Sequence, residues 1–202
     1  MMTRDEFAHR LLNACEEVIA SEDELTQIDA KFGDADHGLT MVKVASAIRD
    51  AVNDAEGGVR ELLDDAAMAV MVLNGGSAVP LWNTWLDGMQ ESAPDADELD
   101  AAQAKAMFAN ALTELADMSG AQVGDKTMMD ALIPASEAVQ VAEGDVADVI
   151  AAGAAAAEEG AENSKNFPSK FGRAKSYGDK TIGTPDAGAV SMARFWRGLA
   201  RA

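Results

Sequence analysis

Apolar residues recur at spacings of three and four along most of the chain, which is the pattern of helices with one buried face. One such series is Met41, Val44, Ile48 and Val52. The other segments with this periodicity are 4–20, 63–73, 78–91, 108–115, 126–142, 145–161 and 187–200. No run of alternating β-branched residues indicates a strand. The sequence therefore predicts an all-α fold of about eight helices joined by short loops.

Length and composition favour one globular domain spanning 1–202, large enough to bury a core of its own. Abundant alanine with only 5% aromatic residues suits closely packed helices. The single cysteine, Cys15, excludes an internal disulfide and agrees with a reducing compartment. The apolar runs are too short to span a membrane, and the first residues lack the apolar segment of a secretory signal. We expect a cytoplasmic protein with no membrane partner.

The charge balance excludes one class of partner. Thirty-five acidic and 16 basic residues give a net charge of -19, whereas binding to nucleic acid requires a positive footprint. A solvated acidic surface, including that of a halophilic source, is the simple interpretation. If the protein binds a polyanion such as a nucleotide, its few cations and a metal ion must neutralise it locally.

Three carboxylates crowd the segment IDAKFGDADHGLTM, at Asp29, Asp34 and Asp36. Two carboxylates about 5 Å apart repel by about 3 kcal/mol at an effective dielectric near 20, so a shared site favours a bound cation. Oxygen ligands select magnesium, calcium or manganese. An EF-hand is excluded because Ala45 stands where that loop needs its glutamate. A short ligand set completed by water or phosphate is typical of magnesium, and a merely solvated loop is the alternative.

Glycine-rich helix starts suggest anion-binding sites. HGLTM opens one helix, where Gly38 permits close approach, Thr40 adds a hydroxyl, and His37 either donates to a phosphate or simply packs. LNGGSAVPLW precedes another helix, although an ordinary helix end followed by a serine cap explains it equally well. In GAQVGDKTMMDAL, Asp125 replaces the second glycine of a Walker A loop, so we expect it to cap a helix starting at Lys126.

The long segment 163–186 contains Arg173 and several glycines and ends in a Pro-Asp-x-Gly helix start. Long ordered loops of this kind are often lids or binding loops. Arginine in such a loop is suited to a phosphate, although a surface arginine is the commoner case.

Four motifs resemble, in order and spacing, those of the nucleotide-binding L subunit (L domain) of dihydroxyacetone kinases. They are IDAKFGDADHGLTM, NGGSAVPLW, GAQVGDKTMMDALIPA and GRAKSYGDKTIGTPDAGAVS, and the resemblance covers nearly the whole chain. It implies an up-and-down barrel of eight helices that binds ADP or ATP at one end through two magnesium ions. The motifs depart from the family pattern at Ala78, Val79 and Asn83, and at a pair of lysines in the last motif, which leaves the substrate and phosphoryl donor open.

The resemblance implies roles for individual residues. Asp29, Asp34 and Asp36 would hold magnesium. The implied nucleotide-binding residues are His37, Gly38, Thr40, Met41, Gly76, Ser77, Gly120, Met129, Arg173, Asp186 and Gly188. No catalytic residue is expected on this chain alone.

The resemblance also implies a division of labour. In the family, a histidine of a separate K subunit or domain binds the ketose covalently, and nothing in these 202 residues resembles that lobe. We expect a phosphotransferase with an alcohol acceptor, such as dihydroxyacetone or a related tetrulose, active only with its K-type partner. The donor, free ATP or ADP recharged by a phosphocarrier protein, stays open, as does a homodimer. The alternatives are the nucleotide subunit of another kinase of the same helical family and a non-enzymatic nucleotide-sensing module.

Overall fold

The computed structural model describes all residues, 1–202, and consists almost entirely of helices. The α-helices are α1 (Arg4–Ala20), α2 (Glu22–Asp29), α3 (His37–Asp54), α4 (Val59–Met71), α5 (Ala78–Ser92), α6 (Ala101–Ser119), α7 (Met129–Val141), α8 (Val146–Asn163) and α9 (Ala187–Ala200). Two 3-10 segments, η1 (Ser164–Asn166) and η2 (Arg173–Thr181), lie between α8 and α9. Two-residue strands β1 (Met2–Thr3) and β2 (Glu98–Leu99) pair antiparallel, with Met2 opposite Leu99.

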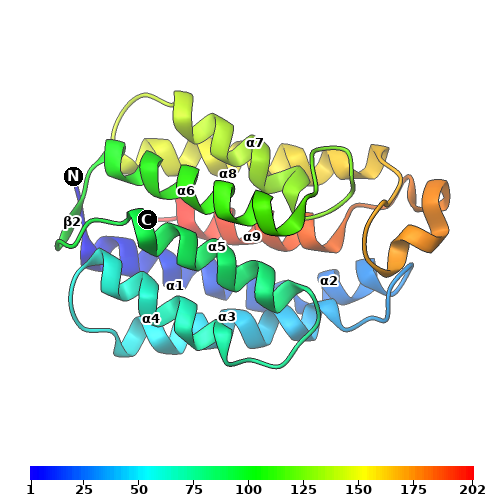
Figure 1. Ribbon diagram of the computed structural model, residues 1–202, viewed down its shortest axis with the longest axis horizontal. Coiled ribbons are helices and arrows are strands. Elements are labelled where there is room, and N and C mark those ends of the chain that lie inside the picture. The colour runs from blue at the N-terminus through cyan, green and yellow to red at the C-terminus, as the bar shows by residue number, and fades with distance from the viewer.

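Eight of the helices form a closed ring. Each packs on its neighbours in the order α1, α3, α4, α5, α6, α7, α8, α9, and α9 returns to α1. The short helix α2 sits in the connection between α1 and α3 and leans on α3 and α9. Figure 1 shows the long helices running along one axis, with the chain turning back at each end. The prediction of an all-α up-and-down barrel is confirmed.

Side-chain caps fix where several helices begin. Thr3 accepts a hydrogen bond from the Glu6 amide while Glu6 bonds back to the Thr3 amide. Asp100 and Asp145 form the same reciprocal arrangement at the starts of α6 and α8. These pairs satisfy amide groups that the helix itself leaves without partners. The last helix, α9, is capped by Asp186, which accepts from the Ala189 amide.

The ring closes on a core in which large aromatic side chains meet small residues. Trp82, Trp85 and Phe195 contact one another edge to face, with centroids 5.2–5.6 Å apart. Elsewhere the helices approach closely at glycines, and a side chain at Gly198 would collide with the Ala14 backbone. Such contacts explain why the composition is rich in small residues and poor in aromatics.

One helix was not predicted, and the start of another was predicted wrongly. Residues 22–29 form α2, which the apolar periodicity did not indicate because Leu25 is its only buried residue. The helix expected from Lys126 begins at Met129, since Lys126 adopts a left-handed conformation with φ +61°. Asp125 therefore caps no helix. Its carboxylate accepts from the Gln122 amide and pairs with Lys170 at 2.7 Å.

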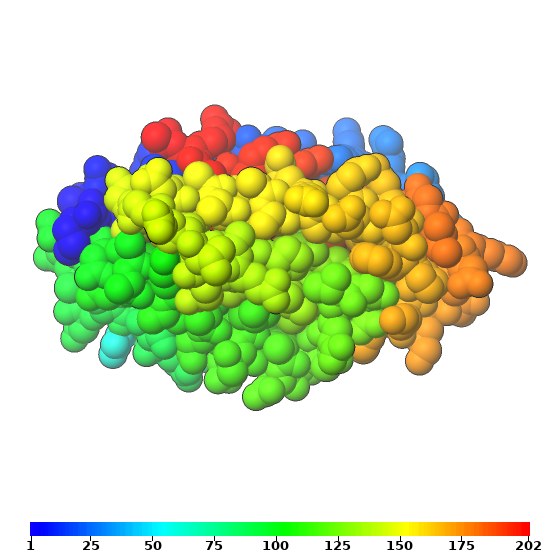
Figure 2. All heavy atoms as spheres, turned by 90° about the horizontal axis from the view of Figure 1, so that it is seen from above, coloured from blue at the N-terminus to red at the C-terminus, as the bar shows by residue number.

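The two ends of the ring differ. Both chain termini lie toward the end that carries β1 and β2, and the connection between α8 and α9 lies at the other end, beside α2 (Figure 1). Figure 2 shows the residues near 175 protruding beyond the helices at that end. None of the helices combines the length and apolar character needed to cross a lipid bilayer.

Candidate functional site

A cavity of about 590 Å³ opens at the end of the ring opposite the termini. Its walls come from the α2–α3, α4–α5 and α6–α7 connections and from the segment between α8 and α9. This volume suits a ligand of nucleotide size. The segments that carry the four sequence motifs therefore meet at one place.

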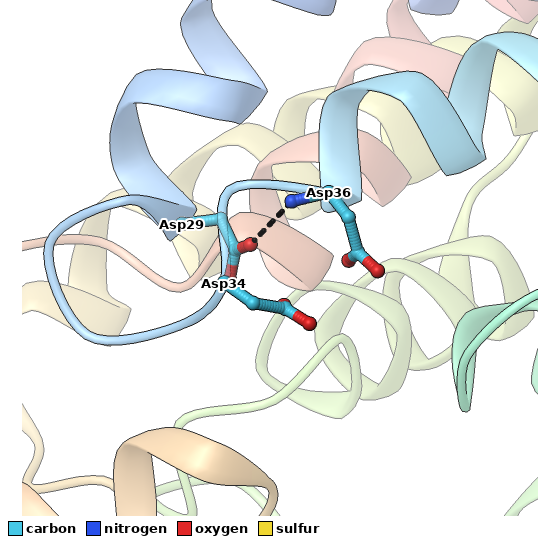
Figure 3. Close-up of side chains that lie close together, drawn as sticks. All are labelled: Asp29, Asp34 and Asp36. Carbon is cyan, nitrogen blue, oxygen red and sulfur yellow. Dashed lines mark hydrogen bonds between the residues drawn. The ribbon is translucent and has the colours of Figure 1, made fainter.

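The three carboxylates gather at one edge of this cavity (Figure 3). Asp29 is the last residue of α2, while Asp34 and Asp36 lie in the loop before α3. One oxygen from each lies within 4.8 Å of the other two. The loop is held in shape by the Asp36 amide, which donates to the Asp29 carboxylate at 3.1 Å, and Ala35 takes a left-handed φ of 62°.

This donor set fits a hard divalent cation. It consists of carboxylate oxygens alone, with no sulfur or imidazole in the cluster, which favours magnesium, calcium or manganese. Asp34 and Asp36 are exposed toward the cavity, which leaves room for water or phosphate to complete the coordination. One positively charged side chain already contacts the cluster: the Arg173 guanidinium pairs with Asp34 at 2.8 Å.

The first turn of α3 forms the wall next to the carboxylates. His37 and Thr40 line the cavity. Gly38 and Met41 do not: Gly38 is buried where a side chain would collide with Thr26 on α2, and Met41 is fully buried in the core. The start of α3 is thus closely packed on α2 and borders the cavity beside the carboxylates. The first amides of a helix have no partner within the helix, so this is a suitable place for an anion.

His37 is tied to α9. Its Nε2 lies 3.2 Å from the Ser191 hydroxyl, and that hydroxyl donates its proton to the Gly188 carbonyl at 2.9 Å. Burial lowers the pKa of His37, although Asp29 and the Ala187 carbonyl act in the opposite direction. His37 therefore links the starts of α3 and α9.

The start of α5 forms a second wall. Gly76 and Ser77 line the cavity, and the Ser77 side chain makes no capping hydrogen bond. An added side chain at Gly76 would meet open space. Ala78 lines the cavity, but Val79 turns away from it, is 6% exposed and lies against Gly75. The departure from the family pattern at Val79 therefore changes the packing below the wall rather than the wall itself.

A further part of the lining is apolar. It is built from α5, α6 and the start of α7, with lining residues Leu81, Trp82, Met118, Ala121, Met128 and Met129. Gly120 ends α6 with φ +64° and does not line the cavity, although both of its neighbours do. Methionine and tryptophan surfaces of this kind suit a flat aromatic ring.

The segment 163–186, which we call the lid, covers the cavity between these walls. Its residues Phe171 and Arg173 line the cavity. The tip touches the carboxylate loop twice, through the Arg173–Asp34 pair and through a tilted ring contact between Tyr177 and Phe32 with centroids 5.3 Å apart. The tip is therefore held by exposed contacts that are individually weak.

Asp186 and Gly188 lie where the lid joins α9, and both line the cavity. Burial raises the pKa of Asp186 to about 7, and the nearby Asp130 acts in the same direction. The Ala189 amide and Lys126 oppose this shift. Lys126, which also lines the cavity, carries no signal in the sequence, because its partners are backbone carbonyls far along the chain.

Comparison with known proteins gives one family. Residues 31–201 match the DAK2 domain. A D-erythrulose kinase of Mycolicibacterium smegmatis is 36% identical over 198 residues, which are 95% of this chain and 34% of that protein. The ADP-binding subunit DhaL of the PEP-dependent dihydroxyacetone kinase of Escherichia coli is 30% identical over 198 residues, covering 95% of this chain and 93% of the subunit.

Two solved structures share the fold. The dihydroxyacetone kinase of C. freundii in complex with AMP-PNP and Mg2+ superposes with a TM-score of 0.70 at 24% identity, over 96% of this chain and 33% of that one. Its native form gives 0.75 at 22% identity, over 99% and 35%. The chain thus spans about a third of the length of the erythrulose kinases and of these crystallised kinases.

Proposed function

The chain belongs to the DAK2 domain family, and from this premise we propose that it binds ADP or ATP with magnesium and serves as the nucleotide-holding part of a ketose kinase. One observation carries the proposal. The three carboxylates, the starts of α3 and α5, and Arg173 all border a single cavity. This arrangement offers a cation site, backbone donors for phosphate and an apolar wall for a base.

Each group has a task in this proposal. Asp29, Asp34 and Asp36 hold two magnesium ions, which supply neutralisation of phosphate charge when bound. The amides at the start of α3 and the Ser77 hydroxyl orient the phosphates. The Arg173 guanidinium, in exchange for Asp34, can turn to phosphate oxygens as a two-pronged donor. Phosphoryl transfer then depends on positioning and charge neutralisation, with no protein nucleophile required.

The acceptor is proposed to be a small ketose held by a K-type subunit or domain. Dihydroxyacetone and four-carbon ketoses are both candidates, since relatives named for each resemble the chain. We therefore assign the ketose site to that partner and not to this cavity. Binding energy from the nucleotide does not replace that second site.

The relatives differ in the phosphoryl donor or nucleotide that their names indicate. The Escherichia coli subunit is named for a PEP-dependent kinase and for binding ADP, whereas the crystallised C. freundii kinase holds AMP-PNP. Either free ATP or a bound ADP recharged by a phosphocarrier protein fits this cavity. We propose both as donors to be tested separately.

A coupled assay tests the proposal in three arms: the chain alone, the chain with a K-type subunit and ATP, and the same mixture with a PEP-driven phosphocarrier relay. We expect ketose phosphorylation only when the K-type subunit is present, and calorimetric binding of ADP only when magnesium is present. Robust ketose phosphorylation by the isolated chain would overturn the division of labour. Magnesium-dependent binding without transfer in any arm would point to a nucleotide-sensing module.

A further inference from the structure

A buried lysine lies at the base of the lid. Lys126 belongs to the connection between α6 and α7, is 4% exposed and lines the cavity. Its Nζ donates to the carbonyls of Ser164 at 2.7 Å, Phe167 at 3.1 Å and Thr184 at 2.5 Å. An ammonium group has three protons, so all three are engaged. Lys126 is therefore not available as a direct phosphate ligand while the lid keeps this shape.

The three carbonyls come from both ends of the lid. Ser164 and Phe167 lie where the chain leaves α8, and Thr184 lies just before α9. Two further hydrogen bonds join the same two ends of the lid. The Gly183 amide donates to the Lys165 carbonyl at 2.8 Å, and the Asp186 amide donates to the Ser164 hydroxyl at 2.9 Å. The lid is a loop with a closed neck, and Lys126 bridges that neck from outside.

The backbone at Lys126 supports a role for its side chain. A φ of +61° is unfavourable for any residue with a Cβ and costs about 1 kcal/mol or more. The turn is held by Asp130, whose carboxylate accepts from the amides of Gly124 at 2.6 Å and Thr127 at 2.7 Å. Glycine would adopt this turn without strain. What lysine adds at this position is the ammonium group.

The charge at this point is also unusual. Burial lowers the pKa of Lys126, and the carboxylates of Asp186 and Asp130 counter that shift. A buried ammonium is tolerated only when hydrogen bonds and opposite charge compensate for lost hydration. The neck of the lid supplies the hydrogen bonds, and the cavity residue Asp186 supplies part of the charge.

We propose that Lys126 is a positioning residue for nucleotide binding, which fastens both ends of the lid and so fixes where Arg173 and Asp186 face the cavity. The inference rests on the proposed function, because it assumes that a magnesium nucleotide fills the cavity. It separates the lid into a fastened neck and a tip held by exposed contacts. Closure then moves the tip while the neck stays in place.

Two substitutions and a matched control test this role. Lys126→Met removes the ammonium and keeps the chain length, and Lys126→Gly removes it while relieving the left-handed strain. The control is Lys105→Met, because the Nζ of Lys105 also donates to backbone carbonyls, those of Gln140 at 3.2 Å and Ala142 at 2.6 Å, away from the cavity. Each variant is titrated with magnesium–ADP by calorimetry, melted thermally, and digested with trypsin, which cuts after the lid's exposed lysines and Arg173.

We expect both Lys126 variants to raise the Kd for magnesium–ADP at least tenfold and to speed cleavage between 165 and 180, with or without nucleotide. Lys105→Met should lower the melting temperature yet keep the parent Kd and the parent cleavage pattern. A parent-like Kd and lid cleavage in both Lys126 variants, or in Lys126→Gly if Lys126→Met does not fold, would overturn the proposal.

Failure of the proposed function gives a different result. If the parent chain itself does not bind magnesium–ADP, the nucleotide site is wrong whatever the variants do. Digestion without nucleotide then still decides whether Lys126 fastens the lid. Faster lid cleavage in the Lys126 variants than in Lys105→Met supports the fastened neck, and equal cleavage refutes it.

Discussion

Neutralising one carboxylate of the cluster should stabilise the free protein and abolish its response to magnesium nucleotide. One oxygen each of Asp29, Asp34 and Asp36 lies within 4.8 Å of the others. At that separation a pair of charges repels by about 0.9 kcal/mol in water and about 3.5 kcal/mol at an effective dielectric of 20. Asp34→Asn removes two of the three repulsive pairs. It also weakens the Arg173 pair, which is worth at most about 1 kcal/mol because Arg173 is 73% exposed.

The balance without ligand therefore favours the variant by about 1 kcal/mol, taking the repulsion at its value in water. For a domain of this size that corresponds to a rise of about 2–4 °C in Tm. With magnesium–ADP at about a hundred times its Kd, the parent gains about 2.7 kcal/mol by linkage, whereas the variant has lost a metal ligand and should gain much less. The order of the two melting temperatures is expected to reverse.

Thermal unfolding of the parent and variant in EDTA and in magnesium–ADP measures both effects. Asp50→Asn is the matched control, since Asp50 pairs with Arg49 at 2.9 Å on the outside of α3 and lies away from the cavity. The control should leave the ligand-induced shift intact. A ligand-induced shift in Asp34→Asn equal to that of the parent would refute the metal assignment. A clear loss of stability in EDTA would show that the arginine pair, and not repulsion, dominates the cluster.

Three further predictions concern the lid, Asp186 and the helix contacts. Trypsin should cut the parent between 165 and 180 more slowly when magnesium–ADP is present, and equal rates would count against a nucleotide lid. Burial raises the pKa of Asp186 to about 7 in the folded protein, so the free energy of unfolding falls as the pH rises from about 4 to about 7. The variant Asp186→Asn still caps α9 and avoids this loss. It should therefore gain up to a few kcal/mol over the parent in denaturant unfolding at pH 8, and nothing at pH 4. Gly198→Ala should lose about 1–3 kcal/mol in the same assay because its methyl group meets the Ala14 backbone, whereas Gly76→Ala, which faces open space, should lose far less.

The ring of helices was predictable because each long helix has one continuous buried face. Val44, Ile48 and Val52 on α3 are all buried, as the spacing requires. The short helix α2 was not predictable in this way, since eight residues with only Leu25 buried carry no apolar period. The start of α7 was misplaced for a different reason. The left-handed turn at Lys126 depends on Asp130 and the lid, which are tertiary contacts that local pattern does not express.

The candidate site, like the fold, could be predicted from the sequence only in part. The carboxylate loop is contiguous in sequence, so its crowding can be recognised from the residues alone. That these aspartates hold magnesium stays a prediction. The contacts that shape the lid could not be recognised, because Lys126 bonds to main-chain carbonyls 38 to 58 residues away, and a carbonyl has no sequence signature. The resemblance also assigned nucleotide binding to Gly38, Met41 and Gly120, but none of these three residues lines the cavity. Gly38 is packed on α2, and Met41 is buried in the core.

The position of the chain termini restricts how a second domain can be tethered. Both termini lie away from the end that carries the cavity (Figure 1). The 18-residue α3 is about 27 Å long at 1.5 Å per residue. A tether that returned along the ring would need at least about eight extended residues to cover that distance. A domain attached by a shorter tether would have to reach along the ring with its own body to deliver an acceptor to the cavity of its own chain, or else serve the cavity of a neighbouring molecule.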